Sequence, residues 1–82
     1  MSKHKKNSSE TLTGIITPVE WEDDQITAVM LCADDDEDYR IENGEKFLEL
    51  VQTYIKATGE VKRDRKSHRS INIKSYNIIE SF

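Results

Sequence analysis

The chain has 82 residues, of which 34% are charged and 35% hydrophobic, and its formal net charge is −4. A chain of this length can build one domain with a small core, so a second domain is excluded. A single cysteine excludes an internal disulfide and is typical of a reducing compartment. No segment approaches the roughly 20 apolar residues that span a bilayer. The basic N-terminus is not followed by an apolar run, so we expect no signal peptide and a cytoplasmic protein.

Charge is distributed unevenly along the chain. Residues 1–9 are polar and carry three lysines, which predicts a disordered basic arm, with the folded domain at 10–82. Residues 10–54 hold thirteen acidic side chains against two basic ones, whereas 55–82 hold seven basic against three acidic. The two halves of the domain therefore predict a dipolar surface, which can attract a partner without identifying it.

Three strands are expected in the first half of the domain, because β-branched and apolar residues recur there between polar turns. Gly14 predicts a bend within the first strand, and Pro18 predicts a distortion, since proline has no N–H to donate to a ladder. A turn at 22–24 and an acidic loop at 34–38 connect the strands. The expected strands cover residues 12–19, 26–32 and 39–42.

The apolar spacing changes from strand-like to helical at Asn43. Phe47, Leu48 and Val51 would share one face of a helix, and Asn43 stands in the N-cap position, so we predict one short helix over about 43–51. Alternation returns afterwards and predicts two further strands, at 54–62 and from residue 71. Their inward residues would include Val61 and Ile71. The alternation slips after Lys74, which predicts a bulge near Lys74–Ser75.

Three strands, a short helix and two strands within about 70 residues is the element order of the OB (oligonucleotide/oligosaccharide-binding) fold. Gly14 would let a long first strand join both sheets, and Gly59 would relieve crowding in the interior of a barrel. Over residues 14–80 the chain resembles small uncharacterised bacterial proteins with an OB-like fold. The resemblance implies a mostly β, five-stranded Greek-key barrel with its helix between the third and fourth strands. It implies no particular activity, because OB folds host unrelated functions.

Catalytic and metal-binding signatures are weak. The run Asp34–Asp38 has oxygens for Ca²⁺ or Mg²⁺, but a calcium loop needs alternating carboxylates, a glycine and a distal Glu. We therefore expect a solvated loop, with a weak divalent site as the alternative. Cys32 and His68 are the only nucleophile–base candidates, and Cys32 ends an apolar strand, where a thiol usually packs. We expect neither an enzyme nor a cofactor.

The basic segment between the last two strands is the strongest functional signal, because this loop helps to hold ligands in OB folds. Contacts with the phosphates of a nucleic acid need only such positive charges, and they give affinity without sequence preference. Trp21 and Tyr39 could stack on bases. The alternatives are a solvated hairpin that pairs with the acidic loop, a Trp21 that caps one end of the barrel and a Tyr39 that faces inward with Ile41. The basic candidates are Arg63, Arg65, Lys66 and Arg69, flanked by Lys56 and Lys74.

Two classes of function remain open from the sequence. In the first, the chain is a small module that binds single-stranded nucleic acid through the basic hairpin. In the second, it is a protein-interaction domain that uses its dipolar surface or a sheet edge. In either case we expect a monomer that does not associate with a membrane and binds no small-molecule cofactor.

Overall fold

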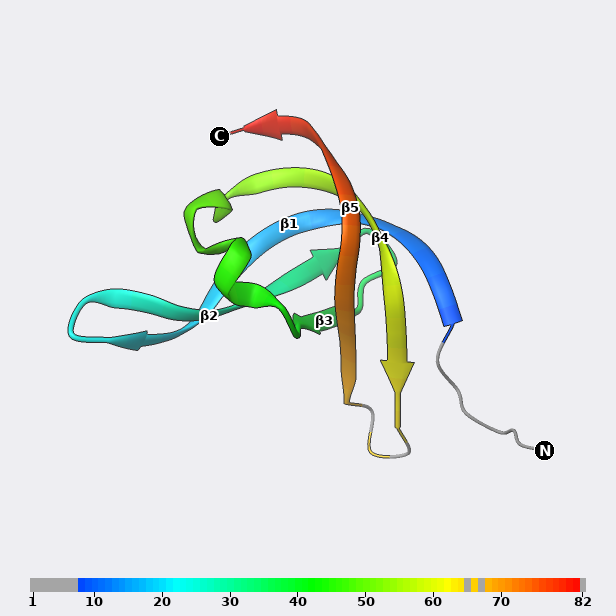
Figure 1. Cartoon of the computed structure of the whole chain (residues 1–82), viewed down its shortest axis with the longest axis horizontal. Coiled ribbons are helices and arrows are strands. Elements are labelled where there is room, and N and C mark those ends of the chain that lie inside the picture. The colour runs from blue at the N-terminus through cyan, green and yellow to red at the C-terminus, as the bar shows by residue number, and fades with distance from the viewer. Residues whose placement is uncertain (1–7, 65, 67, 82) are drawn as a thin grey trace.

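The computed structural model describes residues 8–64, 66 and 68–81 and confirms a mostly β domain. Five strands form one sheet in the order β1–β2–β3–β5–β4, and β4 pairs again with β1, so that the sheet closes in a ring (Figure 1). Among the described ladders, only β3 and β5 run parallel. The strands are β1 (Ser8–Glu22), β2 (Gln25–Ala33), β3 (Asp38–Ile41), β4 (Thr53–Arg63) and β5 (Arg69–Ser81).

The first strand begins earlier than predicted. Ser8 pairs with Val61 and Ser9 with Glu60, so β1 includes two residues that precede the expected domain boundary at residue 10. The rest of the predicted disordered arm, residues 1–7, lies outside the described residues. None of the described helices is long and apolar enough to cross a membrane.

Two glycines let neighbouring strands approach closely. β1 pairs with β4 through residues 8–15 and with β2 through residues 14–22, so Gly14 belongs to both ladders, as predicted from its position. A Cβ there would collide with the backbone of Cys32. A Cβ at Gly59 would collide with the carbonyl of Asn72 on β5. Gly59 is buried, and its missing side chain leaves room for the backbone of the adjacent strand.

The predicted irregularities in the strands are confirmed. The β1–β2 register shifts between Pro18 and Glu20. The β4–β5 register shifts between Thr58 and Gly59, where Lys74 is passed over as the extra residue of a bulge. The bulge explains the slip in the apolar pattern, since one extra residue returns the following side chains to the inner face.

The segment between β3 and β4 does not form the single helix predicted over 43–51. It contains two separate 3₁₀ turns, η1 (Gly44–Lys46) and η2 (Leu48–Leu50), joined at Phe47. Phe47 is only 3% exposed, and its backbone (φ −123°, ψ 9°) is not helical, so packing in the core interrupts the helix. Asn43 is not a side-chain cap: its amide bonds to both the N–H and the C=O of Ile73 on β5, at 3.0 and 2.8 Å.

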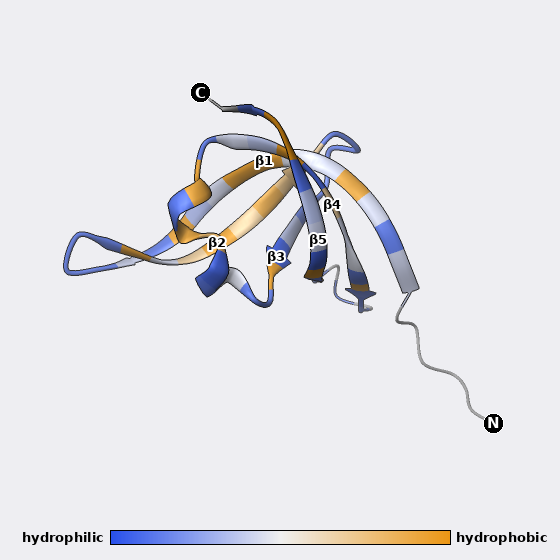
Figure 2. Cartoon of the chain, turned by 45° about the horizontal axis from the view of Figure 1, so that its top comes forward, coloured by the Kyte–Doolittle hydropathy of each residue, from blue (hydrophilic) through white to orange (hydrophobic). Residues whose placement is uncertain are grey.

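The core lies inside the ring. Val61 and Ile71, predicted to face inward, are fully buried. Apolar residues concentrate in the middle of β1 and β2, whereas the β1–β2 turn is hydrophilic (Figure 2). Burying this small apolar set is the main favourable contribution to the stability of the domain. The buried apolar residues are Ile16, Val29, Leu31, Tyr39, Ile41, Phe47, Ile55, Ala57, Val61, Ile71 and Ile73.

Candidate ligand groove

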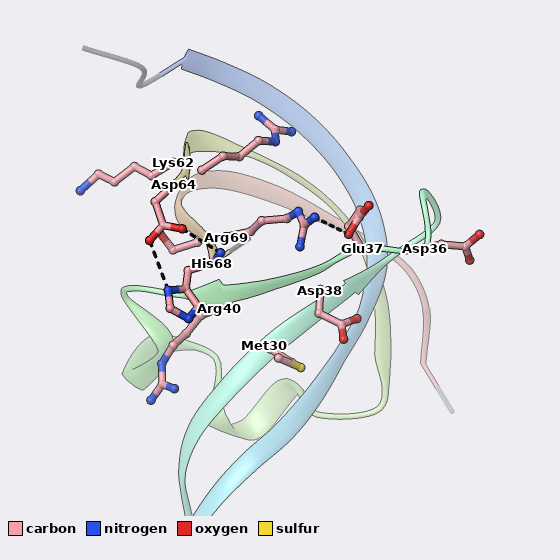
Figure 3. Close-up of a pocket in the computed structure, with 11 residues that line it drawn as sticks. Met30, Asp36, Glu37, Asp38, Arg40, Lys62, Asp64, His68 and Arg69 are labelled. Atoms are coloured by element: carbon pink, nitrogen blue, oxygen red, sulfur yellow. Dashed lines mark hydrogen bonds and ion pairs between the residues drawn. The ribbon is translucent and has the colours of Figure 1, made fainter. Parts of the chain in front are cut away.

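An open groove of about 680 Å³ lies between β2, β3 and the β4–β5 hairpin (Figure 3). Met30 is the one apolar side chain among its described lining residues. The described lining holds four acidic and four basic side chains, so that its formal charges cancel when His68 is neutral. The residues that line it are Met30, Asp36, Glu37, Asp38, Arg40, Lys62, Arg63, Asp64, His68, Arg69 and Ser70.

The acidic run forms one wall of the groove and is an ordered loop. Asp35 accepts hydrogen bonds from the backbone N–H of Glu37 and from the hydroxyl of Tyr39, both at 2.9 Å. Glu37 in turn pairs with Arg69 across the groove at 2.9 Å. In Figure 3 the side chains of Asp36 and Asp38 point in different directions. Among the described residues no group of three His, Cys, Asp or Glu side chains converges as a metal site would require.

Arg63, which lines the groove, and Tyr39, which does not, belong to one hydrogen-bond network. Arg63 donates to both carboxylate oxygens of Glu10, at 2.7 and 3.0 Å, and to the hydroxyl of Tyr39 at 3.2 Å. The hydrogen bond from Arg63 lowers the pKa of Glu10, while burial, reinforced by Asp35, raises the pKa of Tyr39. The Tyr39 ring is only 1% exposed, which confirms the inward-facing alternative. Tyr39 cannot stack on a base, so its assignment to the binding site was wrong.

The tip of the β4–β5 hairpin is shaped by Asp64. Its carboxylate accepts from the backbone N–H groups of Lys66 and His68, at 2.8 and 2.9 Å, and lies 3.2 Å from the imidazole Nδ1 of His68. The backbone hydrogen bond from His68 is the main cause that lowers the pKa of Asp64. Lys66 and His68 are both exposed, and His68 lines the groove. Arg65, another predicted contact, lies outside the described residues.

The other predicted residues are spread over the surface. Arg69 lines the groove together with Arg63, whereas Lys56 and Lys74 are exposed on β4 and β5 and do not line it. Trp21 is 59% exposed near the turn of the β1–β2 hairpin, which extends away from the ring (Figure 1). Trp21 therefore does not line the groove. It also does not cap one end of the ring, which was the alternative to a role in stacking.

Sequence reasoning missed Met30 and Arg40, which face each other across the β2–β3 ladder. The alternation along each strand indicates their orientation. Arg40 lies between two inward residues of a short alternating strand, so its side chain points outward. Met30 alternates in the same way between buried neighbours on β2. Only the fold, however, brings these two positions beside the β4–β5 hairpin.

The nucleophile–base pair considered from the sequence is not assembled. The thiol of Cys32 lies 3.3 Å from the hydroxyl of Thr17, and the imidazole of His68 contacts Asp64. His68 lines the groove and Cys32 does not.

No protein-family model, no curated protein and no solved structure matches this chain. The class of protein is therefore set by the structure alone: a small β domain whose sheet closes in a ring and carries an open groove of balanced charge.

Proposed function

We propose that this protein is a non-enzymatic binding module with an OB-type Greek-key barrel, and that the groove holds its ligand. The strand order, with β1 shared between two ladders and β3 parallel to β5, agrees with that fold. OB folds bind ligands on the face of strands two and three, between the loops that border it. The observation that carries the proposal is the position of the groove on that face, beside the β4–β5 hairpin.

The charges of the groove favour a polypeptide segment as the ligand. Four carboxylates among the described lining residues would repel a chain of phosphates, whereas a segment with both basic and acidic side chains can complement them and the four basic groups. No aromatic ring lines the groove among those residues, and single-stranded nucleic acids are usually held by stacking on such rings. We therefore favour the protein-interaction class of function.

The ion pairs at the groove can be exchanged for contacts with a ligand. Arg40 lies 3.4 Å from Glu20, and both side chains are more than half exposed. Lys62 lies 3.5 Å from Glu42, whose pKa is lowered mainly by a hydrogen bond from Ser70 and further by Lys62. Exposed pairs of this kind contribute about 0–1 kcal/mol each, so a carboxylate of the ligand can replace the present partner of Arg40 at little cost.

The test uses peptides selected from a displayed random library against the immobilised full chain, then synthesised and measured by calorimetry. Arg40→Glu should weaken binding of the selected peptides about tenfold, which corresponds to about 1.4 kcal/mol. Lys56→Glu is the matched control, because it changes the net charge equally at a residue outside the groove. Equal affinities of the two variants would contradict the proposal.

Single-stranded nucleic acid is the second candidate, favoured by the exposed cations Lys62 and Lys66 at the hairpin. Four phosphate contacts would give a log–log salt slope of about −3. This slope is measured by titrating a mixed-sequence 15-nucleotide strand into the protein at a series of salt concentrations from 50 mM upward. Lys66→Ala should make the slope shallower by about 0.7. Absence of binding at 50 mM salt would remove this candidate.

A further inference from the structure

A second, smaller hollow adjoins the groove along β3. Its volume is about 410 Å³, and Arg40 and Ser70 line both this second hollow and the groove. The two residues pair with each other in the parallel β3–β5 ladder, so they mark the place where the two hollows meet. The groove and the second hollow therefore form one path that follows β3.

The outward face of β3 forms the middle of this path. Tyr39 and Ile41 are buried in the core, and side chains alternate along a strand, so Asp38 and Arg40 point outward. Both are exposed, and both line the groove (Figure 3). A negative charge is therefore followed, two residues further along the path, by a positive one.

Glu42 continues the alternation of charge into the second hollow. Its backbone N–H bonds to a carbonyl of β5 at 2.8 Å, so the pairing with β5 extends one residue beyond β3. Its carboxylate accepts from the hydroxyl of Ser70 at 2.8 Å and lies 3.5 Å from the amine of Lys62, which holds it in place. Among the described residues that line the second hollow, Glu42 and Glu45 carry carboxylates and Arg40 carries the positive charge. The second hollow therefore favours a basic side chain.

An extended polypeptide matches the spacing of these charges. Alternate side chains of an extended segment point the same way and are about 6.6 Å apart, which is also the spacing of alternate side chains on β3. A segment that lies along β3 can thus place one side chain against each of Asp38, Arg40 and Glu42. Opposite charges in these positions attract, and like charges repel.

We propose that the ligand is an extended polypeptide segment with the pattern basic–x–acidic–x–basic, and that the second hollow is the subsite for one of its lysine or arginine side chains. The inference rests on the proposed function of the groove. The acidic side chain of the segment faces Arg40, and the two basic side chains face Asp38 and Glu42. The pattern reads the same in both directions, so the charges allow the segment to run either way along β3.

Sequencing the peptides selected from the random library against the immobilised full chain tests the pattern, which should be enriched over the unselected library. Glu42→Lys should weaken binding of these peptides about tenfold in calorimetry, because like charges then meet in the second hollow. Glu45→Lys changes the same hollow without removing the bond from Ser70 to Glu42, and should weaken binding about threefold. Glu49→Lys is the matched control, since it makes the same charge change at an exposed residue of η2 that lines neither hollow.

A change of charge in the peptide separates recognition from any effect on the fold. When the basic side chain at each end of a selected peptide is replaced in turn by glutamate, one of the two peptides should regain affinity for Glu42→Lys.

Selected peptides that need Arg40 but bind Glu42→Lys and Glu45→Lys as tightly as Glu49→Lys would overturn this inference and leave the proposed function standing. Selected peptides without the pattern, or no recovery with either altered peptide, would also overturn it. If no peptide is selected, or if Arg40→Glu has no effect, the proposed function fails together with this inference.

Discussion

Replacing Asn43 with alanine should destabilise the domain more than its partly exposed position suggests. The change removes two hydrogen bonds, of 2.8 and 3.0 Å, and leaves the N–H and C=O of Ile73 without their partner. Ile73 is 4% exposed, so water cannot easily replace the lost contacts. A buried backbone group left unsatisfied costs about 1–3 kcal/mol. Because the two bonds are only partly buried, we expect a loss of about 2–4 kcal/mol in the free energy of unfolding.

Urea unfolding measures this loss as a lower midpoint with an unchanged slope. Hydrogen exchange supplies a second readout, since the amide of Ile73 should lose its protection in Asn43→Ala. Asn77→Ala, at an exposed position on the same strand, is the control and should change stability by less than about 0.5 kcal/mol. If Asn43→Ala stays within that same limit and the Ile73 amide stays protected, Asn43 does not join the 3₁₀ segment to β5.

Three further predictions concern the core, the strand contacts and the pH dependence of stability. Ile71→Ala should cost about 2–4 kcal/mol in urea unfolding through lost burial and a cavity, and a loss below about 0.5 kcal/mol would place this side chain outside the core. Gly59→Ala should lower the midpoint of thermal unfolding, because its Cβ meets the carbonyl of Asn72, and an unchanged midpoint would show that the strands are further apart than described. Arg63 lowers the pKa of Glu10 below its ordinary value of 4.5, so the ionised carboxylate stabilises the fold above that pH and this contribution is lost as the pH falls through the lowered pKa. Glu10→Gln should flatten the dependence of stability on pH in that acidic window, and curves parallel to the wild type would contradict the role of this pair.

Much of the strand architecture could be predicted from the sequence, because alternation, proline and glycine act locally. Pro18 predicted the distortion of β1, and the slip in apolar phase located the bulge at Lys74. The helix over 43–51 was predicted from local spacing, but the structure breaks it at Phe47, where burial in the core overrides the helical pattern. The bond of Asn43 to Ile73 joins residues 30 positions apart, a separation that no local signal reveals.

The site was predicted less well, because it depends on which distant residues meet. The structure places the β4–β5 hairpin beside the groove, but Arg63 is held by Glu10 and Tyr39, and Lys56 does not line the groove. Alternation places Tyr39 on the same face of β3 as Ile41, but only the structure shows that this face is buried in the core. The balance of charge in the groove likewise appears only when the acidic loop and the basic hairpin are brought to opposite walls.

Backbone amide shifts of the ¹⁵N-labelled chain, titrated with a peptide selected against it, test the central claim most directly. We predict shifts at Met30, Asp38, Arg40 and Ser70, which line the groove, and none at Trp21. The same titration with the 15-nucleotide strand separates the two ligand classes, and we expect smaller shifts with the nucleic-acid strand than with the peptide. Shifts confined to the β1–β2 turn or to the C-terminal half of β5, with the groove residues unmoved, would contradict the assignment of the groove as the binding site.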